Sequence, residues 1–137
     1  MGYNLEVRLD AELWWKQGVR DLETARHCRQ SGDHYAAAFF CQQSAEKALK
    51  GIYIELKRES SGPGHSLVFL GKQLGADREL LTFFRELNAE YVATRYPDAA
   101  NGLPHENYDD SISERLIAGV EKVLTWLEGL IPKPTQS

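Results

Sequence analysis

Residues 35–56 read YAAAFFCQQSAEKALKGIYIEL, and this stretch decides the fold. Its small and apolar residues recur at steps of three and four, which is the spacing of one face of an α-helix. That face consists of Ala38, Cys41, Ala45, Ala48, Ile52 and Leu56. Because small residues make up its first half, a second helix can approach closely. The sequence therefore predicts a helix from about residue 34 to residue 58, packed tightly against a neighbour.

Four further helices are expected from the same periodicity and from punctuating residues. The first spans about residues 11–30, a short one lies between Ser66 and Gly75, another runs from Asp77 to about residue 93, and the last ends before Pro132. The expected N-caps are Asp10, Asp33, Ser66 and Asp77, and Ser111 with Glu114 reads as a capping box. The expected buried stripes are Trp15, Val19, Leu22 and Ala25; Leu80, Phe84, Leu87 and Tyr91; and Ile112, Leu116, Val120, Val123, Leu127 and Leu130.

No segment alternates between apolar and polar residues as a half-buried strand does. Short connections between helices are typical of bundles. We therefore predict an all-α protein, an antiparallel up-and-down bundle of four long helices plus one short helix. Residues 1–137 are expected to form a single domain.

Composition narrows the function classes. The net charge of -4 argues against a broad, sequence-independent nucleic-acid binder, which needs a basic face. No apolar run approaches the ~20 residues of a membrane span, so no membrane association is expected. The two cysteines, Cys28 and Cys41, lie in helical patterns without a metal-ligand spacing. We expect a cytoplasmic protein with no cofactor and no metal site.

Residues 94–110, TRYPDAANGLPHENYDD, interrupt the helical pattern. A connection this long is uncommon in a bundle unless it is functional or disordered. Tyr96, Leu103 and Tyr108 can pack, which a disordered tether does not need. The interpretations that remain are an ordered functional loop and a decorated connector.

CQQSAEKALKG at residues 41–51, the HSL turn at 65–67 and RYPD at 95–98 occur in an order that resembles the HEPN domain family. The resemblance spans about residues 14–130. It implies an all-α bundle that usually pairs with itself. Many members resemble metal-independent ribonucleases, often the toxin of a toxin–antitoxin pair. Others accompany a small nucleotidyltransferase and are described as nucleotide-binding.

The ribonuclease members carry an arginine and, a few residues later, a histidine. The arginine that matches is Arg95, and the histidine would fall at about residues 100–102, which are Ala100, Asn101 and Gly102. The nearest histidine is His105. In such a site a histidine moves the proton of the ribose 2′-OH, and an arginine holds the phosphate.

The resemblance makes Arg95 and His105 the candidate catalytic residues. The candidate nucleotide- or RNA-binding residues are Arg95, Tyr96, Asp98, Gln43, Glu46, Lys47 and Lys50. Structural roles stay open for each of them. Arg95 can cap the carbonyls that end its helix, Tyr96 can pack under the loop, and His105 can be a plain surface residue. Residues 43–50 can form an internal polar network.

Three functions follow from these alternatives. The preferred one is a dimeric module that binds a nucleotide or RNA and works beside a small nucleotidyltransferase. The second is a metal-independent RNase toxin that uses Arg95 and a displaced His105. The third is a dimerisation scaffold that binds no ligand.

Overall fold

The computed structural model of the chain describes residues 5–61, 66–97 and 102–131, with side chains from residue 8 onward. Within these ranges the chain forms helices and no strand. The elements are α1 (Leu5–Gln30), α2 (His34–Lys57), α3 (Leu67–Gln73), α4 (Arg78–Ala93), the 3-10 helix η1 (Pro104–Asn107) and α6 (Asp110–Leu130).

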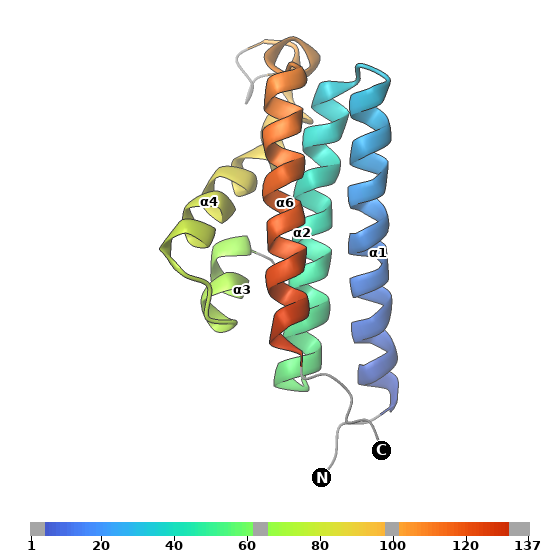
Figure 1. The fold of residues 1–137 in the computed structure, drawn as a ribbon, viewed down its shortest axis with the longest axis vertical. Helices are drawn as coiled ribbons and strands as arrows, with labels where there is room; N and C mark the ends of the chain where they lie inside the picture. The colour runs from blue at the N-terminus through green and yellow to red at the C-terminus, as the bar shows by residue number, and fades with distance from the viewer. Residues whose placement is uncertain (1–4, 62–65, 98–101, 132–137) are drawn as a thin grey trace.

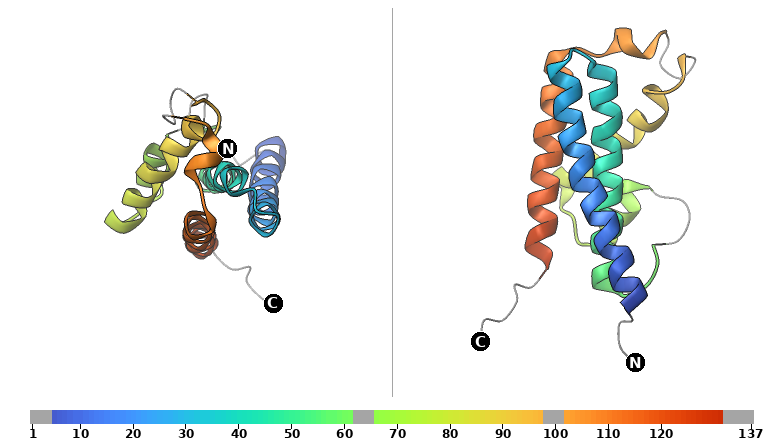
Figure 2. Two further views of the ribbon diagram at one scale, coloured as in Figure 1. Left: turned by 90° about the horizontal axis from the view of Figure 1, so that it is seen from above. Right: turned by 90° about the vertical axis from the view of Figure 1, so that its right-hand side faces the viewer.

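The long helices run alternately up and down (Figure 1). α1, α2 and α6 lie side by side, and α4 lies on the side of α2 opposite α1 (Figure 2). η1 lies at the end of the bundle where α1 turns into α2, and the last turns of α2 and α6 lie at the other end. The predicted all-α up-and-down bundle is confirmed.

Glycines bring α1 and α2 into backbone contact. A Cβ added at Gly18 would lie 2.8 Å from the backbone nitrogen of Ala48, and one at Gly51 would lie 2.8 Å from that of Trp15. Ser44 adds a buried hydrogen bond, because its Oγ donates to the carbonyl oxygen of Gly18 over 2.7 Å. The close approach predicted from the small residues of α2 is therefore real, and it fixes the register of α1 against α2.

The core lies between α2 and the faces that α1, α3, α4 and α6 turn toward it. Its fully buried large side chains include Leu49, Leu67, Phe84, Leu87, Leu116, Val120, Val123 and Leu127. Burial of such side chains, at about 1.5–3 kcal/mol each, provides most of the driving force for folding. Of the stripe predicted for the last helix, Leu116, Val120, Val123 and Leu127 are buried, and Ile112 and Leu130 at its two ends are half-buried.

Three of the predicted stripes were partly wrong. Val19 of α1 and Leu56 of α2 are exposed, although periodicity placed them inside. Tyr91 of α4 is 47% exposed, and its ring stacks on an arginine instead of packing in the core. Val19 lies beside the buried face in the middle of α1, whereas Leu56 and Tyr91 lie near the ends of their helices, so the periodic pattern located each buried face only approximately.

The helix starts required three corrections. α1 begins at Leu5, so Asp10 lies inside the helix and does not cap it. Asp33 is the N-cap residue of α2, but its side chain makes no capping hydrogen bond. α6 is capped by Asp109, whose carboxylate accepts from the backbone N–H of Ile112 over 2.9 Å, and not by Ser111. Ser66 and Asp77 cap α3 and α4 as predicted.

The corrected cap of α6 predicts a difference between two alanine substitutions. Asp109→Ala is expected to lower the free energy of unfolding by about 1 kcal/mol, because it leaves a helix N–H without its acceptor. Ser111→Ala is expected to change it by less than about 0.5 kcal/mol, because Ser111 is exposed and lies within the helix. Urea titrations of both variants measure the difference. An equal loss of unfolding free energy in both would support the capping box of Ser111 and Glu114 instead.

Neither cysteine forms a disulfide. Burial raises the pKa of the Cys41 thiol to about 12. Burial, followed by the nearby carboxylate of Asp33, also raises the pKa of Cys28. Both thiols are therefore poor nucleophiles. None of the helices in the described ranges has the length and apolar character needed to cross a membrane.

Candidate functional site

Arg95 follows the last turn of α4 and is stacked between two aromatic rings. Its guanidinium carbon lies 3.9 Å from the centroid of the Tyr91 ring and 4.5 Å from that of Phe39 on α2. Nη1 donates to the carbonyl oxygen of Tyr91 over 3.1 Å. The helix-capping role that the sequence left open is therefore present. It uses one donor of a group that has five.

No carboxylate of the described residues forms an ion pair with Arg95. Other arginines of the bundle are paired: Arg26 with Glu121, and Arg29 with Asp110. Arg95 is half-buried and its guanidinium is orientated by the two rings, and within the described ranges its other donors have no partner and can bind an anion. An arginine held in this way suits a phosphate group, which it can bind with two parallel hydrogen bonds.

Local interactions end α4 at this point. Thr94 is the C-cap, and its hydroxyl donates to the carbonyl oxygen of Glu90 over 2.6 Å. The backbone N–H of Arg95 bonds the carbonyl oxygen of Val92 over 3.0 Å. Pro97 lacks an N–H and cannot continue the helix. Arg95 is thus attached to a firmly terminated helix and not to a loose loop.

His105 lies on the same face of α2 as Arg95. Its ring meets the ring of Tyr35 edge-on, with centroids 6.3 Å apart and an interplanar angle of 64°. Tyr35 and Phe39 are four residues apart on α2, so they occupy neighbouring turns, about 6 Å apart along the axis. The fold therefore places His105 and Arg95 over adjacent turns of one helix, although nine residues separate them in the sequence. His105 is exposed.

The structure says less about Tyr96 and Asp98, the other two residues of the loop that were predicted to bind a ligand. Tyr96 is 50% exposed, which leaves one part of its ring open to a base or a partner. Asp98 falls outside the described residues.

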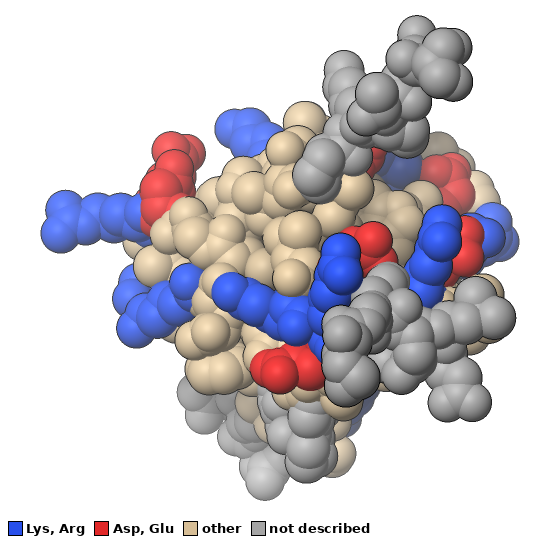
Figure 3. Space-filling view, turned by 90° about the horizontal axis from the view of Figure 1, so that it is seen from below, with Lys and Arg blue, Asp and Glu red and all other residues tan. Residues whose placement is uncertain are grey.

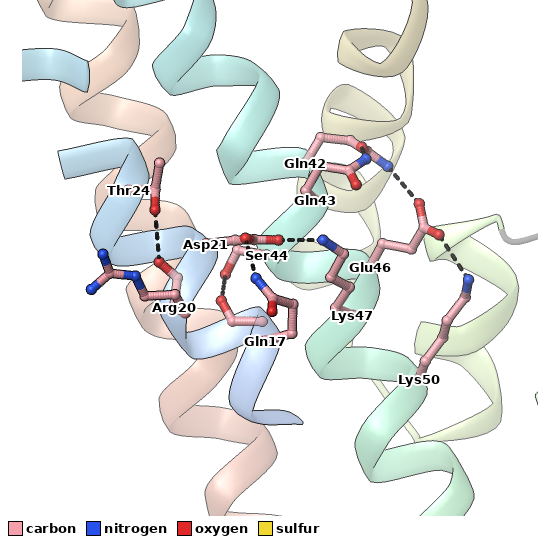
Figure 4. Close-up of polar contacts among 11 residues, drawn as sticks. Gln17, Arg20, Asp21, Thr24, Gln42, Gln43, Ser44, Glu46, Lys47 and Lys50 are labelled. Carbon is pink, nitrogen blue, oxygen red and sulfur yellow. Dashed lines mark hydrogen bonds and ion pairs between the residues drawn. The ribbon is translucent and has the colours of Figure 1, made fainter. Parts of the chain in front are cut away.

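The residues predicted on α2 form an internal network (Figure 4). Gln43 donates to Gln42 over 2.7 Å, Gln42 donates to Glu46 over 3.0 Å, and Glu46 accepts from Lys50 over 2.8 Å. The Lys50 ammonium also lies 4.7 Å from the ring of Trp14. This arrangement matches the structural role that the sequence left open for these residues.

Lys47 points the other way, toward α1. It donates to the buried carboxylate of Asp21 over 2.7 Å, and Gln17 donates to the same carboxylate over 2.9 Å (Figure 4). The charges of Lys47 and Lys50 are thus balanced by carboxylates of the same chain. Compared with them, Arg95 is the cation better placed for a ligand.

Sequence reasoning missed the aromatic residues of the site. Tyr35 and Phe39 were unassigned, and Tyr91 was placed in the core. A usable signal was present, because Tyr91 precedes Arg95 by four residues and side chains at this spacing meet on a helix. The pairing of Asp21 with Lys47 had no local signal, since it depends on the register of α1 against α2.

Tyr108 and Glu90 form a second polar contact near the site. The Tyr108 hydroxyl donates to the Glu90 carboxylate on α4. Burial raises the pKa of Glu90, and the tyrosine hydrogen bond opposes this only in part. Burial and the same hydrogen bond raise the pKa of Tyr108 above its ordinary range.

The raised pKa of Glu90 predicts a pH dependence of stability. A carboxyl group whose pKa is higher in the folded state contributes stability below its ordinary pKa of 4.5. This contribution is lost as the pH rises through the raised value. The stability of Glu90→Gln relative to wild type is therefore expected to increase as the pH rises above 4.5. Urea titrations at several pH values measure it, and a constant difference would contradict the assignment.

Two other surfaces fit a phosphate ligand less well. An open cavity of about 610 Å³ lies between α1, α2 and α6, but Glu12, Glu55 and Glu128 line it, and Arg8 is the one cation among its described lining residues. The end of the bundle remote from η1 carries acidic and basic side chains intermixed, without a continuous basic face (Figure 3). In the described parts of the chain no group of three histidine, cysteine or acidic residues could hold a metal ion.

Comparisons with known proteins agree on the family. The model of the HEPN domain matches residues 11–130. No curated protein matches the sequence. The structure is similar to TT1696 from Thermus thermophilus, with a TM-score of 0.80 and 30% identity over 88% of this chain and 98% of that one.

Two further solved structures carry the family name. The archaeal HEPN homologue ST0689 has a TM-score of 0.75 and 34% identity, covering 87% of this chain and 95% of its own. A HEPN domain protein from Thermotoga maritima has a TM-score of 0.65 and 25% identity, covering 85% of this chain and 95% of its own. The resemblance inferred from CQQSAEKALKG and RYPD is confirmed, and this chain belongs to the HEPN domain family.

Proposed function

We propose that this protein is a dimeric nucleotide- or RNA-binding module that works beside a small nucleotidyltransferase, as in toxin–antitoxin pairs. The observation that carries the proposal is the Arg95 guanidinium, stacked between Tyr91 and Phe39 and without a carboxylate partner among the described residues. A guanidinium with a fixed orientation and no carboxylate partner among the described residues is suited to bind an anionic ligand.

The chemistry around Arg95 favours a nucleotide over a simple anion. The guanidinium binds a phosphate, while the exposed rings of Tyr91 and Tyr96 offer surfaces on which a base can stack. One stacked base is worth about 1–3 kcal/mol. The net charge of -4 limits such binding to a local site that touches few phosphates.

Dimerisation is supported by the apolar surface around the site. Half of the exposed large apolar side chains of the described residues belong to the elements that carry it: Tyr35, Tyr91, Val92, Tyr96 and Leu103. Such clusters mark interaction surfaces. A twofold dimer through this surface would bring two copies of Arg95 into one groove. Sedimentation equilibrium should give twice the mass of one 15.5 kDa chain, and a monomer at the highest soluble concentration would contradict it.

The nucleotidyltransferase partner is proposed from family membership. Co-expression with the neighbouring open reading frame of its genome, followed by purification through a tag on this chain, tests it. A stable complex with a protein of nucleotidyltransferase sequence is expected, and its absence would remove this part of the proposal.

Ligand binding is tested by calorimetric titration of the wild-type protein with ATP and with a short single-stranded oligoribonucleotide. Saturable binding of at least one of them is expected, with an affinity that falls as salt rises. No heat of binding at millimolar ATP and at high oligoribonucleotide concentration would contradict the binding function and favour a scaffold that has no ligand.

A metal-independent RNase is the second candidate, and one observation favours it. His105 and Arg95 lie over neighbouring turns of α2 through their contacts with Tyr35 and Phe39. In this function His105 exchanges the proton of the ribose 2′-OH, while Arg95 stabilises the charge on the phosphate.

The RNase is tested by incubating the protein with RNA in the presence of EDTA. Cleavage that is lost in both His105→Ala and Arg95→Ala, with the fold retained, would establish it. His27→Ala is the matched control, since His27 is an exposed histidine of α1 outside the site. Activity that survives both site substitutions would rule out this mechanism.

A further inference from the structure

Tyr108 directly follows η1 in the two-residue connection to α6, and it connects the His105 segment to the core. Its side chain is half-buried and packs against the hydrophobic core. Its hydroxyl donates to the Glu90 carboxylate of α4. Directly after it, Asp109 caps α6. The chain is therefore held firmly on the C-terminal side of η1.

η1 itself lies at the surface. It has no buried residue, and Leu103, which precedes it, is 49% exposed. The contact of His105 with Tyr35 is an edge-on contact between two exposed rings. Tyr108, which directly follows η1, is packed against the core and can therefore help to fix His105 over α2.

Glu90, which accepts the hydrogen bond of Tyr108, lies on the helix that leads to Arg95. It is half-buried on α4, and the hydroxyl of Thr94 bonds its backbone carbonyl one turn before Arg95. The charged and titratable groups that face its carboxylate are Glu86 of α4, Arg115 of α6 and Cys41 of α2. A carboxylate withdrawn from water depends on the hydrogen bonds it receives, and Tyr108 supplies one.

We propose that the Tyr108–Glu90 hydrogen bond positions His105 beside Arg95. One end of the bond is three residues after His105, and the other is on α4, five residues before Arg95, which follows the end of that helix. The bond therefore links the two segments that build the site. Tyr108 and Glu90 are positioning residues, which act through His105 and do not touch the ligand. The inference rests on the proposed function, in which His105 and Arg95 form one site, but the position of His105 can be measured without a ligand.

The test compares two substitutions that each remove one tyrosine hydroxyl. Tyr108→Phe deletes the bond to Glu90. Tyr53→Phe is the matched control, because Tyr53 donates to Glu59 over 3.2 Å. Tyr53 lies about 21 Å along α2 from Phe39, at about 1.5 Å per residue. Both variants lose a tyrosine–glutamate hydrogen bond, but only one of these bonds is next to the site.

The first readout is the ¹H–¹³C NMR signal of the His105 ring, assigned by its absence in His105→Ala. In the wild type it should be displaced by the Tyr35 ring. In Tyr108→Phe it should move toward the value of an unstructured histidine, and in Tyr53→Phe it should stay in place. An unmoved His105 signal in a folded Tyr108→Phe would overturn the inference.

Glu90 supplies the rescue. Glu90→Gln keeps an oxygen that accepts from the Tyr108 hydroxyl, so the His105 signal should stay near its wild-type position. Glu90→Ala removes the acceptor and should reproduce the effect of Tyr108→Phe. Equal behaviour of the two Glu90 variants would contradict a positioning role.

The second readout is affinity for the short oligoribonucleotide. Tyr108→Phe is expected to weaken binding several-fold and Tyr53→Phe to leave it unchanged. If the wild type binds no oligoribonucleotide, the proposed function fails, while the His105 signal still decides the positioning role. If binding is normal and the His105 signal does not respond to Tyr108→Phe, this inference fails alone.

Discussion

Arg95→Ala is expected to weaken binding of the short oligoribonucleotide about 10- to 100-fold, because hydrogen bonds to a charged group contribute about 1.5–3 kcal/mol. Every 1.4 kcal/mol is about tenfold in affinity. The loss is expected to be large because Lys47 and Lys50 are already paired with Asp21 and Glu46. These two lysines of α2 are therefore not available to replace Arg95.

Two control variants separate a specific contact from a change in charge. Arg85→Ala removes an exposed arginine of α4, the helix that ends just before Arg95, so it alters the net charge equally, and binding should change less than about twofold. Arg95→Lys keeps the charge but loses the planar group that stacks and binds a phosphate bidentately. The affinity of Arg95→Lys for the oligoribonucleotide should lie between those of the wild type and Arg95→Ala. Equal losses in Arg85→Ala and Arg95→Ala would mean that the ligand responds only to the overall charge.

Gly51→Ala is expected to lower the free energy of unfolding by about 2 kcal/mol, in the range of overpacking substitutions. The new Cβ would lie 2.8 Å from the Trp15 nitrogen and 2.9 Å from the Ala11 carbonyl oxygen, both backbone atoms of α1. Backbone of a packed helix cannot move aside as a flexible side chain can, so α1 and α2 must separate. The helix propensity gained by alanine, about 1 kcal/mol, offsets only part of this loss.

Gly129→Ala is the matched control. Gly129 is also helical, but a Cβ added there meets nothing within 4 Å. Without a clash only the propensity gain remains, and the free energy of unfolding should rise by about 0.5–1 kcal/mol. The melting temperature and the urea midpoint should therefore shift in opposite directions in the two variants. A stabilised Gly51→Ala would mean that α1 and α2 are not in backbone contact.

The arrangement of helices could be predicted from the sequence because its signals are local. Ser66 and Asp77 bond the N–H groups of their own helices three residues on, so their capping roles depend on nothing distant. The start of α1 could not be predicted in the same way. Asp10 has the chemistry of a cap, but helical residues continue before it to Leu5.

The site could be predicted only in part. RYPD identified Arg95, and the family pattern directed attention to a histidine. The contacts that orient Arg95 and His105 come from Phe39 and Tyr35 on another helix. They depend on how η1 and the end of α4 fold back over α2, which no spacing along the chain encodes. The polar α2 residues predicted for ligand binding suit an internal network equally well. The pairing of Lys47 with Asp21 depends on how α1 lies against α2, and the sequence alone does not give that register.

The most direct test of the account is photo-cross-linking of the wild-type protein to a short oligoribonucleotide that contains 4-thiouridine, with the adducts mapped by mass spectrometry. If the Arg95 face binds the ligand, adducts should concentrate on the aromatic residues beside it, Phe39, Tyr91 and Tyr96, and should disappear in Arg95→Ala. Adducts concentrated elsewhere, or unchanged in Arg95→Ala, would contradict the assignment of this face as the nucleotide- or RNA-binding site.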